Sequence, residues 1–195
     1  MEQEDMQALK GKHVAVLATD GVEAFEYLGP RDFLEQHGVR VTLISPKPKG
    51  EAIQSFDRGT QGARFLVEMD VRDARPVHFD GLLLASGEAN PDRLKQSPEA
   101  LAFIREFSLQ DKPIAALGQG PRTLIDAGIA KAKHVTSWPG LQEELRKAGA
   151  EWTDDEVVVD GKLVTSRDPD DLPAFNRTLL QELTLPMGTD PGVTS

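Results

Sequence analysis

The sequence predicts an α/β fold in which a mostly parallel sheet is covered by helices on both faces. The first observation is a series of short apolar runs that are typical of buried parallel strands. The second is that helix-like segments separate these runs, as they do in βαβ units. The third is the length, because 195 residues are enough for one domain with a substantial core.

The first part of the domain is predicted to contain two strands, a helix and a hairpin. Val14–Ala18 is the first strand, and the helix over Ala24–Gln36 that follows ends at a glycine stop signal. Val39–Ser45 is the second strand, and prolines and a glycine end it. Ile53–Asp70 mixes turn residues with alternating apolar residues, which predicts a hairpin or an irregular excursion.

The middle of the chain is predicted to add two strands to the same sheet. Gly81–Ala85 is a third buried strand, and a loop over Ser86–Asp92 follows it. Pro98–Leu109 has the spacing of an amphipathic helix. Pro113–Leu117 is the next strand, and it runs through a sharp turn into a helix over Arg122–Ala130.

The last part is predicted to hold a short strand, a helix, a hairpin and a final helix. In order, these are Val135–Ser137, Gly140–Ala148, the pair Glu156–Asp160 and Lys162–Ser166, and Leu172–Leu183. We therefore expect an N-terminal extension over residues 1–12 and a single domain over residues 13–183. Residues 184–195 are rich in turn residues and are expected to form a flexible tail.

Composition excludes several classes of function. The formal net charge is −10, and such a field repels phosphate backbones, so nucleic acid is not expected as the main partner. No apolar run approaches the roughly 18 residues that a membrane helix needs, so no membrane is expected as a partner either. The first twelve residues are polar and lack the apolar region of a secretory signal, which favours the cytoplasm.

The inventory of reactive side chains is short. The chain has no cysteine, which excludes disulfides, thiolate metal sites and cysteine catalysis. Its four histidines are scattered and form no pair at metal-ligand spacing. We therefore expect no metal and no cofactor. Ser86, Thr136 and Ser137 supply hydroxyls near the predicted cleft, but no histidine accompanies them in a triad arrangement.

Three of the predicted strands are followed by polar or glycine-rich segments. Glu23, the pair Ser86-Gly87 and the pair Gly118-Gln119 each come after a strand. Because ligand sites of open parallel sheets lie at the carboxyl ends of the strands, we expect these residues to meet in one cleft. The strand–turn–helix around Gly118 has the form in which hydrolytic α/β enzymes hold a nucleophile, yet glycine carries no reactive side chain.

Several segments, in colinear order, carry a family resemblance. They are the stretch from His13 to Glu23, the loop from Ala85 to Leu94, Thr136-Ser137-Trp138-Pro139, and the run from Glu151 to Arg177. Over about residues 12–183 the chain resembles the DJ/PfpI superfamily, in particular its intracellular protease I and general stress protein branch. The resemblance implies a flavodoxin-like three-layer sandwich of the kind found in class I glutamine amidotransferases.

The resemblance also implies roles for individual positions. Gly118 stands where the family has its nucleophilic cysteine, and Gln119 stands where a histidine follows it. Glu23 matches the family's acidic partner, and Ser86-Gly87 matches its Gly-Gly oxyanion loop. Asp92 matches an acidic residue that reaches a neighbouring subunit in relatives, which form dimers or larger homo-oligomers.

Each of these positions also has a structural interpretation. Glu23 is either a general acid or base or a carboxylate that stabilises a helix N-terminus. Gln119 either binds a ligand or caps the turn. Trp138 either lines the cleft or packs in the core. The amides of Gly87 and Gln119 either form an anion or carbonyl site or bind only water.

Three functions remain open at this point. The first is a catalytically degenerate, stress-related family member that binds a small or anionic molecule, or a partner, at the former active-site cleft. The second is a thiol-independent enzyme, glyoxalase-like, deglycase-like or hydrolytic, that acts on reactive carbonyls with Glu23 as general base. The third is a structural or chaperone-like homo-oligomer.

Overall fold

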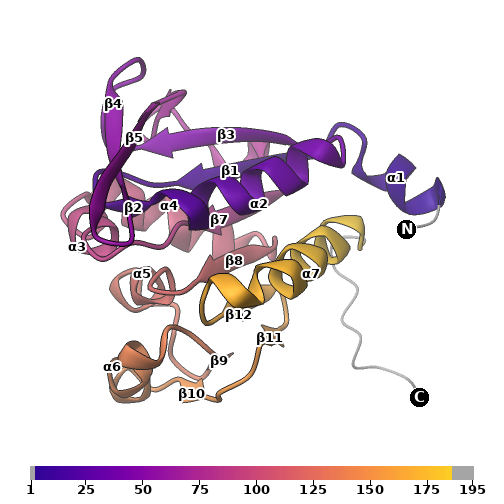
Figure 1. The fold of residues 1–195 in the computed structure, drawn as a ribbon. Coiled ribbons are helices and arrows are strands. Elements are labelled where there is room, and N and C mark those ends of the chain that lie inside the picture. Colours follow the sequence, from indigo (N-terminus) through magenta and orange to yellow (C-terminus); the bar gives the residue numbers. More distant parts are fainter. Residues whose placement is uncertain (1–2, 186–195) are drawn as a thin grey trace, which may run out of the picture.

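The computed structural model describes residues 3–185, which form a three-layer α/β sandwich (Figure 1). The central sheet has seven strands in the order β11-β12-β8-β7-β1-β3-β6. All neighbouring pairs are parallel except β11 and β12, which form an antiparallel hairpin. The structure thus confirms the predicted flavodoxin-like fold with its mostly parallel sheet.

The strands of the central sheet are short, and most of their residues are buried. They are β1 (His13–Leu17), β3 (Arg40–Ser45), β6 (Met69–Asp70), β7 (Gly81–Leu84), β8 (Ile114–Leu117), β11 (Val157–Asp160) and β12 (Leu163–Ser166). Two small sheets flank it. One contains β2 (Val22–Glu23), β4 (Ala52–Asp57) and β5 (Thr60–Leu66), and the other pairs β9 (His134–Val135) with β10 (Glu151–Trp152).

Helices cover both faces of the sheet. The helices are α1 (Gln3–Leu9), α2 (Ala24–Gln36), α3 (Asn90–Leu94), α4 (Pro98–Leu109), α5 (Pro121–Asp126), α6 (Gln142–Lys147) and α7 (Leu172–Thr184). Side chains of α1, α2 and α7 pack in the core on one face, and those of α4, α5 and α6 pack on the other. Alternation along β1 supplies both cores, because Ala15 and Leu17 face one and Val14 and Val16 the other.

Short elements depart from the predicted pattern for local reasons. Part of the predicted loop over residues 86–92 belongs to α3, because Pro91 stands where a helix readily begins. The predicted helix Arg122–Ala130 ends at Asp126, since Gly128 follows in the left-handed region, with φ of +76°. The strand near Val135 pairs outside the central sheet, and the Thr136 amide donates to the Thr165 side chain instead.

The two ends of the domain extend slightly beyond the expected limits. Within the predicted extension, α1 places Leu9 fully in the core beside α7. At the other end Thr184 still belongs to α7, and residues 186–195 of the predicted tail lie outside the described residues. Among helices of residues 3–185, none combines the length and the apolar character needed to span a bilayer.

Candidate functional site

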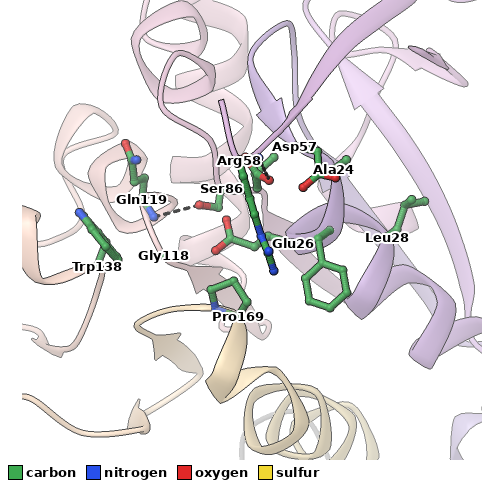
Figure 2. Close-up of a pocket in the computed structure, with 12 residues that line it drawn as sticks. Ala24, Glu26, Leu28, Asp57, Arg58, Ser86, Gly118, Gln119, Trp138 and Pro169 are labelled. Carbon is green, nitrogen blue, oxygen red and sulfur yellow. Dashed lines mark hydrogen bonds between the residues drawn. The ribbon is translucent and has the colours of Figure 1, made fainter. Parts of the chain in front are cut away.

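A cavity of about 720 Å³ lies at the carboxyl ends of the central strands (Figure 2). Of the residues singled out in the sequence, Glu23, Ser86, Gly118, Gln119 and Trp138 all line it. They come from the segments that follow β1, β7, β8 and β9, so the topology brings together positions more than one hundred residues apart.

Two further sequence-predicted residues lie outside the cavity lining. Gly87 has φ of +134°, and a Cβ atom there would stand 2.2 Å from the Gly21 carbonyl oxygen, so only glycine fits. Asp92 pairs with Lys95 at 3.2 Å and with Arg122 at 3.3 Å within the same chain. Gly87 therefore holds two loops close together, and Asp92 anchors α3 to α5.

The turn at Gly118 is held by backbone hydrogen bonds. The Gly118 amide donates to the Ser166 carbonyl at 3.1 Å, and the Trp138 amide donates to the Gly118 carbonyl at 2.8 Å. The Gly120 amide closes the turn onto Leu117 at 2.8 Å. Gly118 has φ of +61°, a left-handed conformation that glycine adopts without the strain other residues incur.

The space beside Gly118 is occupied by two polar side chains. A Cβ atom on Gly118 would lie 2.6 Å from Ser86 Oγ and 3.1 Å from Glu26 Oε1. Ser86 Oγ also accepts a hydrogen bond from the Gln119 amide at 3.1 Å, as Figure 2 shows. The amide that the sequence offered for an anion or carbonyl site therefore already has a partner within the protein.

Glu26 is the buried carboxyl group of the site, and the sequence reasoning did not single it out. It lies in the first turn of α2 and is only 6% exposed. Burial raises its pKa above the ordinary value, hydrogen bonding with Ser86 acts in the opposite direction, and the Glu23 and Asp168 carboxylates raise it further. The signal in the sequence was the i, i+3 spacing from Glu23, which places both carboxyl groups at one end of α2.

Glu23 lies on the rim of the cavity, directly before α2. Its side chain caps no amide of that helix, and Glu23 Oε1 instead accepts a hydrogen bond from the Arg58 amide at 3.1 Å. Its own amide donates to the Ser86 carbonyl at 3.1 Å. Glu23 thus connects the Ser86 loop to the β4–β5 hairpin, while Glu26 approaches Gly118.

The outer wall of the cavity combines exposed aromatic rings with charged groups. Phe25 is 57% exposed and Trp138 is 49% exposed, so Trp138 lies on the cavity wall and not in the core. Asp57 and Arg58 come from the hairpin between β4 and β5, and Arg58 supplies a cation to the lining. Such a wall offers apolar contact to a small molecule and a cationic partner to an anionic one.

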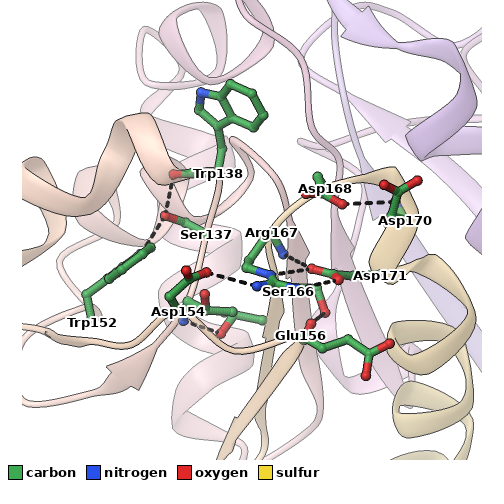
Figure 3. A network of polar contacts seen from close by, with 12 residues as sticks. Ser137, Trp138, Trp152, Asp154, Glu156, Ser166, Arg167, Asp168, Asp170 and Asp171 are labelled. Carbon is green, nitrogen blue, oxygen red and sulfur yellow. Dashed lines mark hydrogen bonds and ion pairs between the residues drawn. The ribbon is translucent and has the colours of Figure 1, made fainter.

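A polar network links Trp152 through Ser137 to the Trp138 backbone (Figure 3). Trp152 Nε1 donates to Ser137 Oγ at 3.0 Å, and the Ser137 hydroxyl donates to the Trp138 carbonyl at 2.8 Å. Ser137 and its neighbour Thr136 are fully buried and do not line the cavity. The geometry therefore gives Ser137 a structural contact at this site.

The described part of the chain offers no metal site. Within residues 3–185, no three His, Asp or Glu side chains are grouped in a way that would hold a metal ion. What the site offers chemically is a buried carboxyl group with a raised pKa, a serine hydroxyl and an open cavity around them.

Comparison with known proteins identifies the family. Residues 12–182 match the DJ-1/PfpI family. Protein/nucleic acid deglycase 2 of Escherichia coli is 38% identical over 174 residues, which cover 88% of this chain and 98% of that protein.

Solved structures show the same relationship. A two-domain protein from Anabaena variabilis, with DJ-1/ThiJ/PfpI-like and ferritin-like domains, superposes with a TM-score of 0.83 at 30% identity and covers 93% of this chain and 52% of its own. Drosophila melanogaster DJ-1beta superposes with a TM-score of 0.77 at 27% identity, over 89% of this chain and 90% of its own. This chain, with its glycine at the apex of the turn, belongs to the DJ-1/PfpI family.

Proposed function

We propose that this protein is a catalytically degenerate family member that binds a small carbonyl compound in the cavity beside Gly118. The observation that carries the proposal is the apex of the turn, where glycine leaves no nucleophile in a chain without cysteine. The family's cysteine-dependent chemistry requires a thiolate, and here nothing can supply one.

Binding is favoured by what the cavity retains. Its volume of about 720 Å³ suits a small molecule, and Phe25 and Trp138 offer exposed ring faces. Glu26, whose pKa is raised by burial, is a hydrogen-bond donor in its neutral form and so matches a carbonyl oxygen. The name of the Escherichia coli relative, a deglycase, supports reactive carbonyls or their adducts as the ligand class.

The setting of this function is part of the same proposal. We place the protein in the stress-related branch of the family on the strength of the family likeness, and we keep the cytoplasm as its expected compartment. A carboxylate-bearing ligand would find a cationic partner in Arg58 on the cavity wall.

A second candidate is a thiol-independent enzyme on the same class of substrate. The observation that favours it is the raised pKa of the buried Glu26 carboxyl, because a general acid or base works best with a pKa near the working pH. Glu23, the residue expected from the sequence, lies on the rim and is the other carboxylate to test.

The deciding experiment measures methylglyoxal consumption and methylglyoxal binding with the same preparations. Wild-type protein, Glu26→Gln and Glu23→Gln are compared for turnover. Binding is followed by fluorescence in a Trp152→Phe background, because the protein has two tryptophans and Trp138 then reports alone from the cavity wall. We expect no turnover and a saturable change in Trp138 emission. Binding should be weakened by Glu26→Ala, which removes the donor, and largely retained by Glu26→Gln, whose amide still donates. Turnover that disappears in either carboxylate variant would establish the second candidate instead.

A further inference from the structure

The position next to the missing nucleophile holds a side chain that the family likeness does not explain. The family's loop has two glycines here, whereas this chain has Ser86 followed by Gly87. Ser86 is 3% exposed, and its hydroxyl oxygen stands 2.6 Å from where a Cβ atom of residue 118 would be. Real Cβ atoms do not approach an oxygen so closely, so a side chain at position 118 and the hydroxyl at position 86 compete for one space.

Ser86 also has two partners in that space. Its oxygen accepts from the Gln119 amide at 3.1 Å, and its hydroxyl stabilises the charged form of Glu26. A buried amide and a buried carboxyl group both cost free energy when they lack partners. One hydroxyl thus fills a volume and satisfies two buried polar groups.

We propose that Ser86 closes the vacated nucleophile position and holds Glu26 and the Gln119 amide in a non-catalytic arrangement. Positions 86 and 118 then act as one unit, and exchanges at positions 118 and 119 alone do not restore a reactive thiol. This inference goes beyond the proposed function, because it concerns the loop at residue 86 and holds whether or not a ligand binds.

The first test is a double-mutant cycle on stability. The effect of Gly118→Ala on stability is measured by urea unfolding with and without Ser86→Ala. Ser86→Ala removes only the hydroxyl, and the Cβ atom that remains at position 86 would lie 3.4 Å from the new Cβ at position 118, which is an ordinary contact. We expect Gly118→Ala to lower the unfolding midpoint more in the presence of the Ser86 hydroxyl than in its absence. If Gly118→Ala lowers the unfolding midpoint equally with serine and with alanine at position 86, the proposal is overturned.

A matched control separates backbone strain from the clash. Gly128 has φ of +76°, close to that of Gly118, and a Cβ atom there would meet nothing within 4 Å. Gly128→Ala therefore reports the left-handed strain alone. Gly128→Ala is expected to lower the unfolding midpoint less than Gly118→Ala does, and Ser86→Ala should not change the effect of Gly128→Ala.

The second test measures the reactivity of a thiol at position 118 against pH, which a purely steric role of Ser86 would not change. Gly118→Cys introduces the only thiol of the chain, and its alkylation by iodoacetamide is measured against pH, with and without Ser86→Ala. Without the Ser86 hydroxyl, the Gln119 amide is free to donate to the thiolate and Glu26 is more readily neutral, and both changes lower the thiol pKa. We expect the profile to shift to lower pH and alkylation at pH 6 to rise roughly tenfold. Superimposable profiles would refute the coupling.

The proposal stays testable if variants at position 118 fail to fold. If Gly118→Cys folds only when Ser86→Ala is also present, that result is itself the expected coupling between the two positions. If neither folds, Ser86→Ala alone decides, because hydrogen exchange at the Gln119 amide is expected to accelerate and the Glu26 carboxyl to titrate at higher pH in NMR spectra. If neither the hydrogen exchange of the Gln119 amide nor the pH titration of Glu26 changes, the proposal is overturned. That outcome would leave the proposed function untouched, because ligand binding is measured separately by Trp138 fluorescence.

Discussion

At the scale of single residues, the site is defined by which side chain faces Gly118. The sequence led to Glu23, while the structure places the Glu26 carboxyl 3.1 Å from where a Cβ atom of residue 118 would be. Both residues lie at the start of α2, and which of them turns inward depends on where the helix begins. Glu23 belongs to β2, so the helix starts one residue later and turns Glu26 toward the cavity.

Glu26 makes stability depend on pH in a direction opposite to that of most carboxylates. Its pKa is raised in the folded state, so the folded protein holds the proton more tightly, and stability falls as pH rises from the unfolded pKa through the folded pKa. Glu26→Gln removes this titration. We expect the free energy of unfolding of wild type, relative to that of Glu26→Gln, to fall as the pH rises from about 4 to about 8. The free energies are measured by urea unfolding at five pH values. If the free energies of wild type and Glu26→Gln change with pH in parallel, the prediction is contradicted.

Arg58 is expected to select ligands by charge. Arg58→Gln removes the positive charge that it contributes to the cavity wall and keeps a polar side chain in the hairpin turn. Binding of glyoxylate, which carries a carboxylate, is expected to weaken about tenfold, because a charge-assisted contact contributes about 1.5–3 kcal/mol. Binding of uncharged methylglyoxal serves as the control and should change little. Equal losses for both compounds, measured through Trp138 fluorescence, would show that Arg58 has only a structural effect.

At the scale of elements, the sequence predicted the long helices well and the short elements poorly. Helix α4 spans Pro98–Leu109 as expected, because Ser97 accepts from the Ala100 amide as an N-cap and Pro98 begins the helix. Strands β2 and β9 have two residues each, too few for any periodicity, and tertiary partners decide their pairing. The same limit applies to the site, where the loop ends were predicted to converge but the contact between Ser86 and Glu26 depends on side-chain positions.

The junction between β12 and α7 contains an ion pair between the buried Asp171 carboxylate and the partly exposed Arg167. Asp171 is buried, and although burial opposes it, hydrogen bonds from the Arg167 side chain and amide hold the Asp171 pKa below its usual range (Figure 3). Asp171→Asn should therefore destabilise the protein by about 2–4 kcal/mol at pH 7. A depressed pKa means that this contribution exists above the unfolded pKa and is lost as pH falls through the folded pKa.

The matched control for this prediction is Asp154→Asn. Asp154 pairs with the same arginine at 2.9 Å, but its side chain is 68% exposed. Exposed ion pairs contribute little, so its loss should cost at most about 1 kcal/mol. Urea unfolding of the two variants at pH 7 compares them directly, and similar losses would argue against the buried pair as the determinant of this junction.

At the scale of the whole molecule, we propose that the protein is a homo-oligomer that associates through the surface between α2 and α7. That surface holds a groove of about 970 Å³ with Phe33 and Leu172 in its wall. Phe25 and Leu185 on its edge are 57% and 45% exposed. A groove with exposed apolar side chains along it is typical of protein–protein contacts.

Light scattering tests this proposal. The chain has a mass of 21.3 kDa, and we expect at least twice that value for wild type in solution. Phe25→Asp places a charge on the edge of the groove and is expected to shift the mass toward one chain. Val77→Asp, at a site that is 67% exposed and belongs to the short helical turn Pro76–His78, should leave the mass unchanged. A wild-type mass of one chain would refute the proposal.

The glycine at the apex of the β8 turn also changes how this protein meets oxidants. A thiolate in such a cleft is a target for peroxide and passes stepwise to sulfenic, sulfinic and sulfonic acid. Here the cavity floor carries glycine, serine and glutamate, none of which enters that series, and the chain has no cysteine elsewhere. The cavity floor therefore offers no group that peroxide would carry through this series, and we expect peroxide treatment of the protein to leave the affinity for the proposed ligand unchanged.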